Sequence, residues 1–205
     1  MRTNDKLVKT IDWGKCDGLV PAIVQDAEKG TVLMLGYMNT EALLATQESG
    51  FVTFWSRSRK CLWKKGETSG NLLRLVNVES DCDNDALLVR ASPVGPTCHT
   101  GSSSCFGQDA APPLAFFAEL DGVLSKRFEE RPANSYTTSL IEAGRKRMAQ
   151  KVGEEGVEVA LASSDEELVE ESADLLFHLM VLLKSQGLRL PDVAKVLRAR
   201  HSNME

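Results

Sequence analysis

The sequence lacks the features of a membrane protein and of a nucleic-acid binder. Its longest nearly apolar run, residues 175–183, contains His178 and is far too short to cross a bilayer. Residues 1–10 carry charges and no apolar stretch of the kind found in secretion signals. Positive charge is not in excess either, because 24 Lys and Arg stand against 29 Asp and Glu, for a formal net charge of -5. We therefore expect a cytoplasmic protein that binds neither membranes nor nucleic acid.

Cysteine is also scarce, and it is unevenly distributed. The chain has 5 Cys, an odd number, and none follows Cys105. Without a secretion signal we expect no framework of disulfides, so the thiols need another explanation. The 205 residues are 42% hydrophobic and 26% charged, which is the composition of an ordinary folded protein with one or two domains.

The two halves of the chain differ in kind. Residues 1–107 hold 10 of the 15 Gly and balance 12 basic with 12 acidic residues, whereas the remainder has 12 basic and 17 acidic residues. Between them lies a small, polar stretch that ends in Pro112 and Pro113, and such a stretch interrupts regular structure. We predict a first domain over residues 1–107, a linker over 108–113 and a second domain over 114–205.

Hydrophobic periodicity predicts an α+β chain of two domains. In the first half, apolar or alternating runs separated by Gly, Asp and Asn predict one helix from Asn39 to Gly50 and strands at 19–25, 32–37, 52–56, 72–79 and 86–91. In the second half, helical spacing predicts helices at 114–129, 139–162, 165–184 and 191–200. The fold class is therefore a β-rich N-terminal domain followed by an all-α helical bundle.

Three cysteines carry the strongest chemical signal of the first half. Zinc prefers thiolate and imidazole ligands, and three protein ligands with one open position define a catalytic zinc site. Cys82, Cys98 and Cys105 supply three such thiolates, and the last two flank His99 in a loop rich in Gly and Ser. His99 is either a ligand in place of one thiol or an acid–base group beside the metal. The alternative is that the cysteines are small buried apolar residues.

Carboxylates alternate around the first of these cysteines. Asp81, Asp83 and Asp85 lie on the same side of the chain if the segment is extended, and their hard oxygen atoms suit Mg²⁺. A solvated acidic turn is the alternative. Cys16 and Cys61 have no such neighbours, and we interpret them as structural residues.

A second constellation of the first half combines cations, hydroxyl groups and glycine. Such a set suits a phosphorylated sugar, because a guanidinium group holds phosphate through two hydrogen bonds and glycine permits close approach. The residues that we assign to substrate phosphate or ribose are Trp55, Ser56, Arg57, Arg59, Lys64, Lys65, Glu67, Thr68, Ser69 and Gly70. The alternatives are a hairpin with a solvated cationic edge and a platform for single-stranded nucleic acid. The balanced charge of this half argues against the platform.

The second half carries acidic residues at helical spacing. The set comprises Glu154, Glu155, Glu158, Glu171 and Asp174. These residues are three or four apart on two successive predicted helices, so their carboxylates project from shared faces. Their repulsion is costly unless divalent cations neutralise it, which indicates Mg²⁺ and a polyphosphate substrate. We assign Lys151, which opens the motif, to substrate phosphate, and we interpret His178 as a core or supporting histidine. A solvated acidic face is the alternative.

These motifs resemble two enzyme families. The first half is similar to phosphoribosyl-AMP cyclohydrolase through the stretches 36–39, 54–59, 62–70, 81–85 and 95–106. The second half is similar to phosphoribosyl-ATP pyrophosphohydrolase, a relative of the all-α MazG-type nucleotide pyrophosphatases, through 135–137, 151–158 and 171–174. The two follow one another in the order seen in bifunctional enzymes of histidine biosynthesis, and together they cover nearly the whole chain.

The resemblance implies two successive hydrolytic reactions. The helical domain would convert phosphoribosyl-ATP to phosphoribosyl-AMP and pyrophosphate with Mg²⁺ on its five acidic residues. The β-rich domain would then open the adenine ring of phosphoribosyl-AMP between N1 and C6 with zinc-activated water. The three cysteines would hold the zinc, the three aspartates Mg²⁺, and His99 is the candidate proton-transfer group. A homodimer is implied as well, and it stays open whether Cys82 comes from the same subunit or the other one.

Two rival functions stand beside this interpretation. One is a housekeeping nucleoside triphosphate pyrophosphatase fused to a zinc-stabilised binding module, which would unfold in its first half when zinc is removed. The other is a dimerisation scaffold without catalytic activity, which would show no metal-dependent turnover.

Overall fold

The computed structural model describes residues 4–107 and 110–202. The chain divides into two compact units, Met1–Ala118 and Glu119–Glu205, and each is described by itself. Residues 108 and 109 of the predicted linker lie outside the described residues. A short 3-10 helix, η2 (Pro113–Ala115), begins at the last residue of the predicted linker. It is followed by α3 (Phe116–Glu130), and the division between the units falls inside α3.

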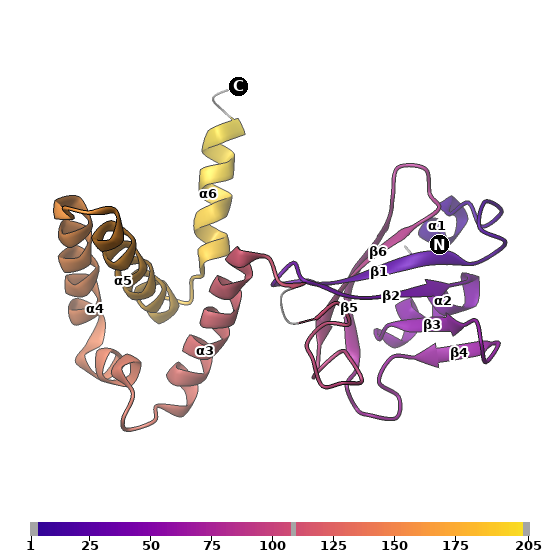
Figure 1. Cartoon of the computed structure of the whole chain (residues 1–205), viewed down its shortest axis with the longest axis horizontal. Helices are drawn as coiled ribbons and strands as arrows, with labels where there is room; N and C mark the ends of the chain where they lie inside the picture. Colours follow the sequence, from indigo (N-terminus) through magenta and orange to yellow (C-terminus); the bar gives the residue numbers. More distant parts are fainter. Residues whose placement is uncertain (1–3, 108–109, 203–205) are drawn as a thin grey trace. The chain divides into compact units, whose positions relative to one another are not determined.

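A four-stranded sheet forms the frame of the N-terminal unit (Figure 1). Its strands stand in the order β2 (Val32–Met38), β1 (Val20–Asp26), β6 (Leu87–Pro93) and β5 (Leu73–Ser80). β1 is antiparallel to β2 and parallel to β6, and β5 is antiparallel to β6. A separate hairpin is formed by β3 (Thr53–Ser56) and β4 (Cys61–Lys64), and the helices of this unit are α1 (Asn4–Thr10) and α2 (Thr40–Ser49).

Alternation along β1 decides which face of the sheet is buried. Its inward-facing residues are Val20, Ala22 and Val24. They belong to one apolar cluster with Leu43 of α2 and Phe54 of β3. The opposite face carries Ile23 and its antiparallel partner Leu35, which are 38% and 45% exposed. Within the described part of one chain, this second face therefore exposes apolar side chains to solvent.

The helical unit is built around one helix pair. α4 (Tyr136–Leu161) and α5 (Asp165–Ser185) pack along one another (Figure 1). α3 joins α5 through Asp121, whose carboxylate accepts a hydrogen bond from Lys184 at 3.1 Å. α6 (Leu190–Ser202) buries none of its residues. One pair is thus well packed, and the other two helices are weakly covered in a single chain.

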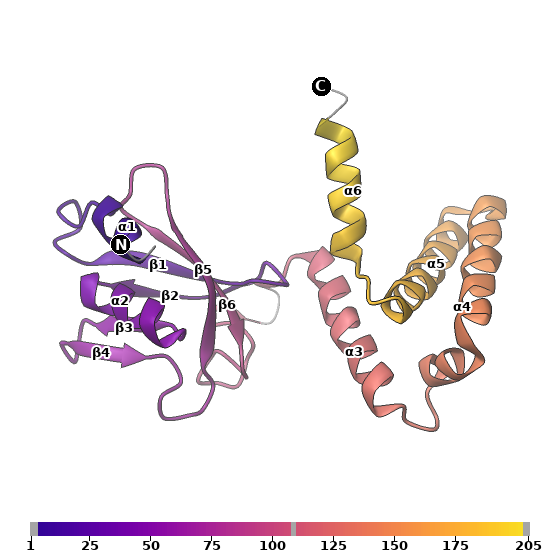
Figure 2. The same ribbon diagram turned by 180° about the vertical axis from the view of Figure 1, so that it is seen from behind.

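α4 is interrupted at Gly144, whose φ of 81° and ψ of 176° lie far from helical values. Figure 2 shows that the short segment before the interruption is turned away from the long second part of the helix. A side chain at this φ would be strained, so glycine is the residue that permits the turn.

The predicted fold class is confirmed, with a β-rich first half and four helices in the second. The predicted strands and helices overlap observed elements and differ by a few residues at their ends. The prediction missed α1 and the four-residue strand β4. Within residues 4–107 and 110–202, none of the helices combines the length and the apolar character that a membrane span requires.

Candidate active sites

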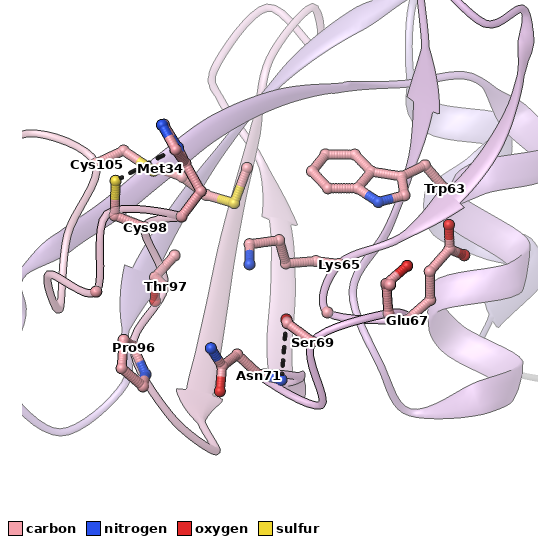
Figure 3. Close-up of a pocket in the computed structure, with 14 residues that line it drawn as sticks. Met34, Trp63, Lys65, Glu67, Ser69, Asn71, Pro96, Thr97, Cys98 and Cys105 are labelled. Carbon is pink, nitrogen blue, oxygen red and sulfur yellow. Dashed lines mark hydrogen bonds between the residues drawn. The ribbon is translucent and has the colours of Figure 1, made fainter.

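A cavity of about 470 Å³ in the N-terminal unit gathers residues from two loops (Figure 3). The loop after β6 contributes Thr97, Cys98 and Cys105, and the loop between β4 and β5 contributes Lys65. The indole of Trp63, in β4, forms another wall. The cavity therefore combines sulfur donors, a cation and an aromatic surface.

Hydrogen bonds fix the cysteine loop against β2. The Cys105 backbone N–H donates to the Leu33 carbonyl at 2.8 Å, and the Ser104 hydroxyl donates to the Val32 carbonyl at 2.7 Å. The Cys98 backbone N–H donates to the Ser102 carbonyl at 3.0 Å, which closes the loop on itself. The predicted pair of thiols is thus held on a well-anchored loop.

The two thiols of this loop differ in acidity. The Thr100 hydroxyl donates to Cys98 Sγ at 3.1 Å, and this bond lowers the pKa of the Cys98 thiol, with a further contribution from the Thr100 backbone. Burial raises the pKa of Cys105, and the neighbouring Cys98 raises it further. His99 Nδ1 lies 3.8 Å from Cys98 Sγ, at the cavity wall. Cys98 is therefore the more readily ionised of the two.

Lys65 extends into the same cavity, as Figure 3 shows. Only 9% of the residue is exposed, and among the described residues no carboxylate forms an ion pair with its ammonium group. Its positive charge favours ionisation of Cys105, against the effects of burial and of Cys98. The next residue, Gly66, has φ 84°, and a Cβ atom there would lie 2.1 Å from the Asn71 carbonyl oxygen. This close approach requires glycine.

The acidic turn between β5 and β6 forms a separate cluster. Asp81, Asp83 and Asp85 each offer a carboxylate oxygen, and these atoms lie within 4.8 Å of one another. Lys15 Nζ donates to Asp83 at 2.8 Å and to Asp85 at 3.3 Å, and it holds the pKa of Asp83 below its ordinary value. Cys82 is exposed. Within the described residues of one chain, its sulfur does not form a group with those of Cys98 and Cys105 in which all three atoms lie within 4.8 Å of one another.

The predicted phosphate-binding residues are divided between two hollows. Lys65, Glu67, Thr68 and Ser69 line the cysteine cavity, whereas Trp55, Ser56 and Arg57 line a second hollow of about 380 Å³. Trp63 borders both hollows.

The remaining members of that set have other contacts. The Arg57 guanidinium stacks on Tyr37 at 3.8 Å, and Arg59 lies 3.9 Å from the Glu67 carboxylate. The Lys64 ammonium lies 5.9 Å from the ring centroid of Phe51, and Lys64 lines neither of the two hollows. Gly70, with φ 77°, ends the turn that carries Thr68 and Ser69.

In the helical unit, three of the five predicted acids converge. Glu155 and Glu158 of α4 and Glu171 of α5 each offer an oxygen within 4.8 Å of the others. Glu155 is only 4% exposed, and Lys151 Nζ lies 2.5 Å from its Oε1. Lys151 lowers the pKa of Glu155, while the hydrogen bond that Glu158 shares with Glu155 raises the pKa of Glu158. The cluster has the donor chemistry that a hard divalent cation requires.

The other two predicted acids are placed differently. Glu154 contacts Arg147 at 3.2 Å, Gln150 at 2.8 Å and Lys151 at 3.0 Å, and it is not part of the three-carboxylate group. Asp174 is not part of that group either, and its backbone carbonyl lies 2.9 Å from His178 Nδ1.

Comparison with known proteins assigns each half of the chain to an enzyme family. Residues 34–107 match the model of the phosphoribosyl-AMP cyclohydrolase family, and residues 117–201 match that of the phosphoribosyl-ATP pyrophosphohydrolase family. The histidine biosynthesis bifunctional protein HisIE of Xylella fastidiosa (strain Temecula1) is 56% identical over 97% of this chain and 97% of its own. The HisIE proteins of Photobacterium profundum and Escherichia coli (strain K12) are also 56% identical, over 96% and 94% of this chain and 99% and 96% of theirs. The chain belongs to the HisIE family.

As a HisIE protein, the chain is a bifunctional enzyme of histidine biosynthesis. Its C-terminal domain is a phosphoribosyl-ATP diphosphatase and its N-terminal domain a phosphoribosyl-AMP cyclohydrolase, so these two nucleotides are its substrates. The match of the first half to an enzyme family replaces the rival interpretation of that half as a zinc-stabilised binding module.

Several contacts in these HisIE sites escape prediction from the sequence. Lys15 lies 68 residues before Asp83, and no motif links them. Thr100 stands within the predicted loop, but its bond to Cys98 depends on how that loop closes. Tyr136 meets His178 across 42 residues, and the only signal was that each stands near a motif of the second half.

Proposed function

We propose that zinc in the cyclohydrolase domain is held by Cys98, Cys105 and Cys82 of the partner subunit. The observation that supports this is the pair of thiols on one cavity wall, since two soft donors with mutually perturbed pKa values suit zinc. A catalytic zinc site uses three protein ligands, and an exposed Cys82 on a second copy is the remaining sulfur donor. The enzyme is then a homodimer in which each subunit completes the site of the other.

The distribution of apolar surface supports the homodimer. In the N-terminal unit the outer face of the sheet exposes Ile23 and Leu35, and in the helical unit α6 exposes Val196 and Leu197. Large apolar side chains grouped on an otherwise polar surface are typical of protein interfaces. A second copy of the chain would cover these apolar surfaces and would also supply the third sulfur.

Ring opening requires one new bond and one broken bond. The oxygen of water bonds to C6 of the alkylated adenine, the C6–N1 bond breaks, and a proton is transferred to N1. When bound, zinc supplies a site at which water loses its proton near neutral pH. We assign the proton transfer to His99, which lines the cavity next to Cys98.

The two hollows suit the two ends of phosphoribosyl-AMP, because this molecule carries a phosphoribosyl group on each side of its purine. We propose that Lys65 and Ser69 bind one phosphate, that Ser56 and Arg57 bind the other, and that the purine stacks on Trp63, which borders both hollows.

We assign Mg²⁺ in the cyclohydrolase domain to Asp81, Asp83 and Asp85, whose oxygen atoms fit a hard cation. Lys15 now neutralises two of these carboxylates, so the ion must displace its ammonium group. Because Mg²⁺ and the Lys15 ammonium compete for the same carboxylates, the site binds Mg²⁺ more weakly than three aspartates without a neighbouring lysine would.

For pyrophosphate release we assign Mg²⁺ to Glu155, Glu158 and Glu171, with Glu154 and Asp174 reaching the ion only after rotation of their side chains. When bound, Mg²⁺ neutralises phosphate charge and orients water. The oxygen of water bonds to one of the two phosphorus atoms of the α–β bridge, the bond from that phosphorus to the bridging oxygen breaks, and the proton of the water passes to solvent. Lys151 holds Glu155 in place and carries the charge that a departing pyrophosphate requires.

We place the enzyme in the cytoplasm, where a reducing environment keeps thiols available as metal ligands. Enzymatic activity in the soluble fraction of lysed cells, with none released by osmotic shock, is the expected result.

Two substitutions test the proposed sites in the full-length chain. With phosphoribosyl-ATP, Mg²⁺ and zinc, Cys98→Ala should release pyrophosphate but accumulate phosphoribosyl-AMP, because only the ring-opening site loses a ligand. Glu155→Ala should release no pyrophosphate, yet it should still open the ring when phosphoribosyl-AMP is supplied. Each substitution should reduce the affected activity by more than the roughly 10–100-fold loss that is typical when a residue supporting a metal ligand is replaced. Pyrophosphate is measured enzymatically, and ring opening by absorbance.

Cys61→Ala is the matched control, since Cys61 is an exposed cysteine on β4 outside both hollows. It should retain both activities. Loss of both activities in either site variant, with folding intact, would refute the assignment of two independent metal sites.

A further inference from the structure

A tyrosine and a histidine lie behind the carboxylate of Glu155. Tyr136 Oη is 2.9 Å from His178 Nε2. His178 Nδ1 is 2.9 Å from the Asp174 carbonyl oxygen and 3.5 Å from Glu155 Oε1. His178 and Glu155 are both buried, whereas Tyr136 is 54% exposed, so the contact between His178 and Glu155 is the one that is shielded from water.

The directions of these hydrogen bonds follow from the acceptors. A carbonyl oxygen can only accept, so His178 Nδ1 carries a hydrogen and donates it to the Asp174 carbonyl, with Glu155 Oε1 lying 3.5 Å from the same nitrogen. In the neutral ring Nε2 is then an acceptor, and the Tyr136 hydroxyl donates to it. The hydrogen bond from Tyr136 therefore fixes the ring of His178, whose Nδ1 donates to the Asp174 carbonyl and lies 3.5 Å from Glu155 Oε1.

The position of the tyrosine is fixed by packing and by the backbone. Its ring stacks on Phe177, with centroids 6.3 Å apart, and meets His178 edge-on at 5.9 Å. Tyr136 opens α4 before the interruption at Gly144, whereas Glu155 lies after it. The interruption therefore lets two parts of one helix meet the same histidine of α5.

Lys151 and His178 both contact the same oxygen atom of the Glu155 carboxylate. Lys151 Nζ and His178 Nδ1 each contact Glu155 Oε1, at 2.5 and 3.5 Å. The ion pair with Lys151 and the packing of the His178 ring at Oε1 limit rotation of the carboxylate, which leaves its other oxygen, Oε2, for a cation.

We propose that Tyr136 and His178 are positioning residues that orient Glu155 for a divalent cation in the diphosphatase site. This inference rests on the proposed function, in which Glu155 is a ligand of Mg²⁺. Residues that orient a ligand typically change metal affinity by 10–100-fold when they are removed. A merely structural role would instead change stability and leave the affinity of the folded protein unaltered.

The two nitrogens of His178 allow a matched pair of variants. His178→Asn keeps a donor near the position of Nδ1, whereas His178→Gln keeps a polar group near Nε2 and loses the donor to the Asp174 carbonyl beside Glu155. Tyr136→Phe removes only the hydroxyl and retains the stacking on Phe177. His201→Gln, on α6, is the control for replacing a histidine of the same unit.

The experiment measures binding of Mn²⁺, used in place of Mg²⁺, by electron paramagnetic resonance. The full-length chain carries Asp83→Asn in every sample, which weakens the aspartate cluster of the other unit. We expect His178→Gln to raise the dissociation constant about 10–100-fold, Tyr136→Phe to raise it less, and His178→Asn and the control to stay near the parent value. Thermal denaturation without metal reports the stability of each variant.

An unchanged constant in His178→Gln, or equal losses in His178→Gln and His178→Asn, would overturn the positioning role. If His178→Gln does not fold, Tyr136→Phe decides, and an unchanged constant in that variant overturns the proposal. If the proposed function is wrong and Glu155 is not a metal ligand, Glu155→Gln will bind Mn²⁺ as tightly as the parent protein. This result distinguishes failure of the proposed function from failure of the positioning role.

Discussion

At the scale of single residues, Lys65 is the most informative side chain of the cyclohydrolase cavity. It is nine-tenths buried, and the acid closest to it in sequence, Glu67, is paired with Arg59 instead. Its ammonium group faces the cavity and has no carboxylate paired with it among the described residues, so it is available to an anion that enters the cavity. The phosphate of the substrate is the anion that we expect to neutralise it.

Lys65→Met removes this charge and keeps most of the side chain. We expect it to raise the KM for phosphoribosyl-AMP roughly ten- to a hundredfold, since a hydrogen bond to a charged group contributes about 1.5–3 kcal/mol. Pyrophosphate release should be unchanged. Steady-state ring opening followed by absorbance measures the effect, with Lys9→Met on α1 as the control. A KM equal to that of the parent enzyme contradicts the assignment.

At the scale of elements, the start of α5 illustrates a boundary that the sequence specifies. Ser164 caps the helix by accepting a hydrogen bond from the Glu167 backbone N–H at 3.1 Å. The Glu167 carboxylate in turn accepts from the Ser163 backbone N–H and hydroxyl, both at 2.7 Å. This reciprocal arrangement satisfies donors that the first turn of a helix leaves unpaired.

The same bonds make the stability of α5 depend on pH. The Ser163 backbone N–H, and then its hydroxyl, hold the pKa of Glu167 below its ordinary value of 4.5. Ionised Glu167 therefore stabilises the folded state above that value, and its contribution is lost as the pH falls through the lowered pKa. We expect Glu167→Gln to lower the Tm at pH 7, with the difference from the parent vanishing in acid.

Thermal denaturation between pH 7 and pH 3 measures this difference. Glu166→Gln is the control, because it removes the neighbouring charge of the first turn without touching the Ser163 contacts. A difference that persists unchanged at the acidic end argues against the cap.

Prediction from sequence succeeded where a signal was local. Periodicity and caps located the strands and the four C-terminal helices, because both depend on residues within a few positions. β4 was missed because its residues lie in the basic stretch that we interpreted as a phosphate-binding segment. The parallel pairing of β1 with β6 brings Val24 next to Val89, and nothing in either strand specifies that partner.

The sites follow the same rule. The spacing of the glutamates placed Glu155 and Glu158 on one helix face, whereas the division of the arginines and lysines between two hollows depends on how the β3–β4 hairpin lies on the sheet. The contact between Lys15 and Asp83 depends on the whole fold of the N-terminal unit.

At the scale of the whole molecule, the single chain is incomplete in three ways. The cysteine cavity has two of the three thiols that we assign to zinc, the sheet exposes an apolar face, and α6 buries none of its residues. The twofold dimer that we propose would address all three, because each exposed surface would be covered by the other copy and Cys82 would complete the partner's cavity.

Mixing two inactive variants tests this arrangement. Cys82→Ala and Cys98→Ala should each be inactive in ring opening alone. After they are unfolded and refolded together, mixed dimers contain one intact set of three cysteines, so activity should return to about a quarter of the parent value. Mixing without refolding is the control. No recovery, despite dimers that contain both variants, means that each subunit supplies all three sulfurs itself.

The tryptophans lie in one unit only. Trp13, Trp55 and Trp63 are the 3 Trp of the chain, and the last two line the hollows of the N-terminal unit. Indole emission therefore reports on the ring-opening half alone, whereas far-ultraviolet ellipticity is dominated by the long helices of the other half. One heating experiment on the intact enzyme, recorded with both signals, follows the melting of each half separately without cutting the chain.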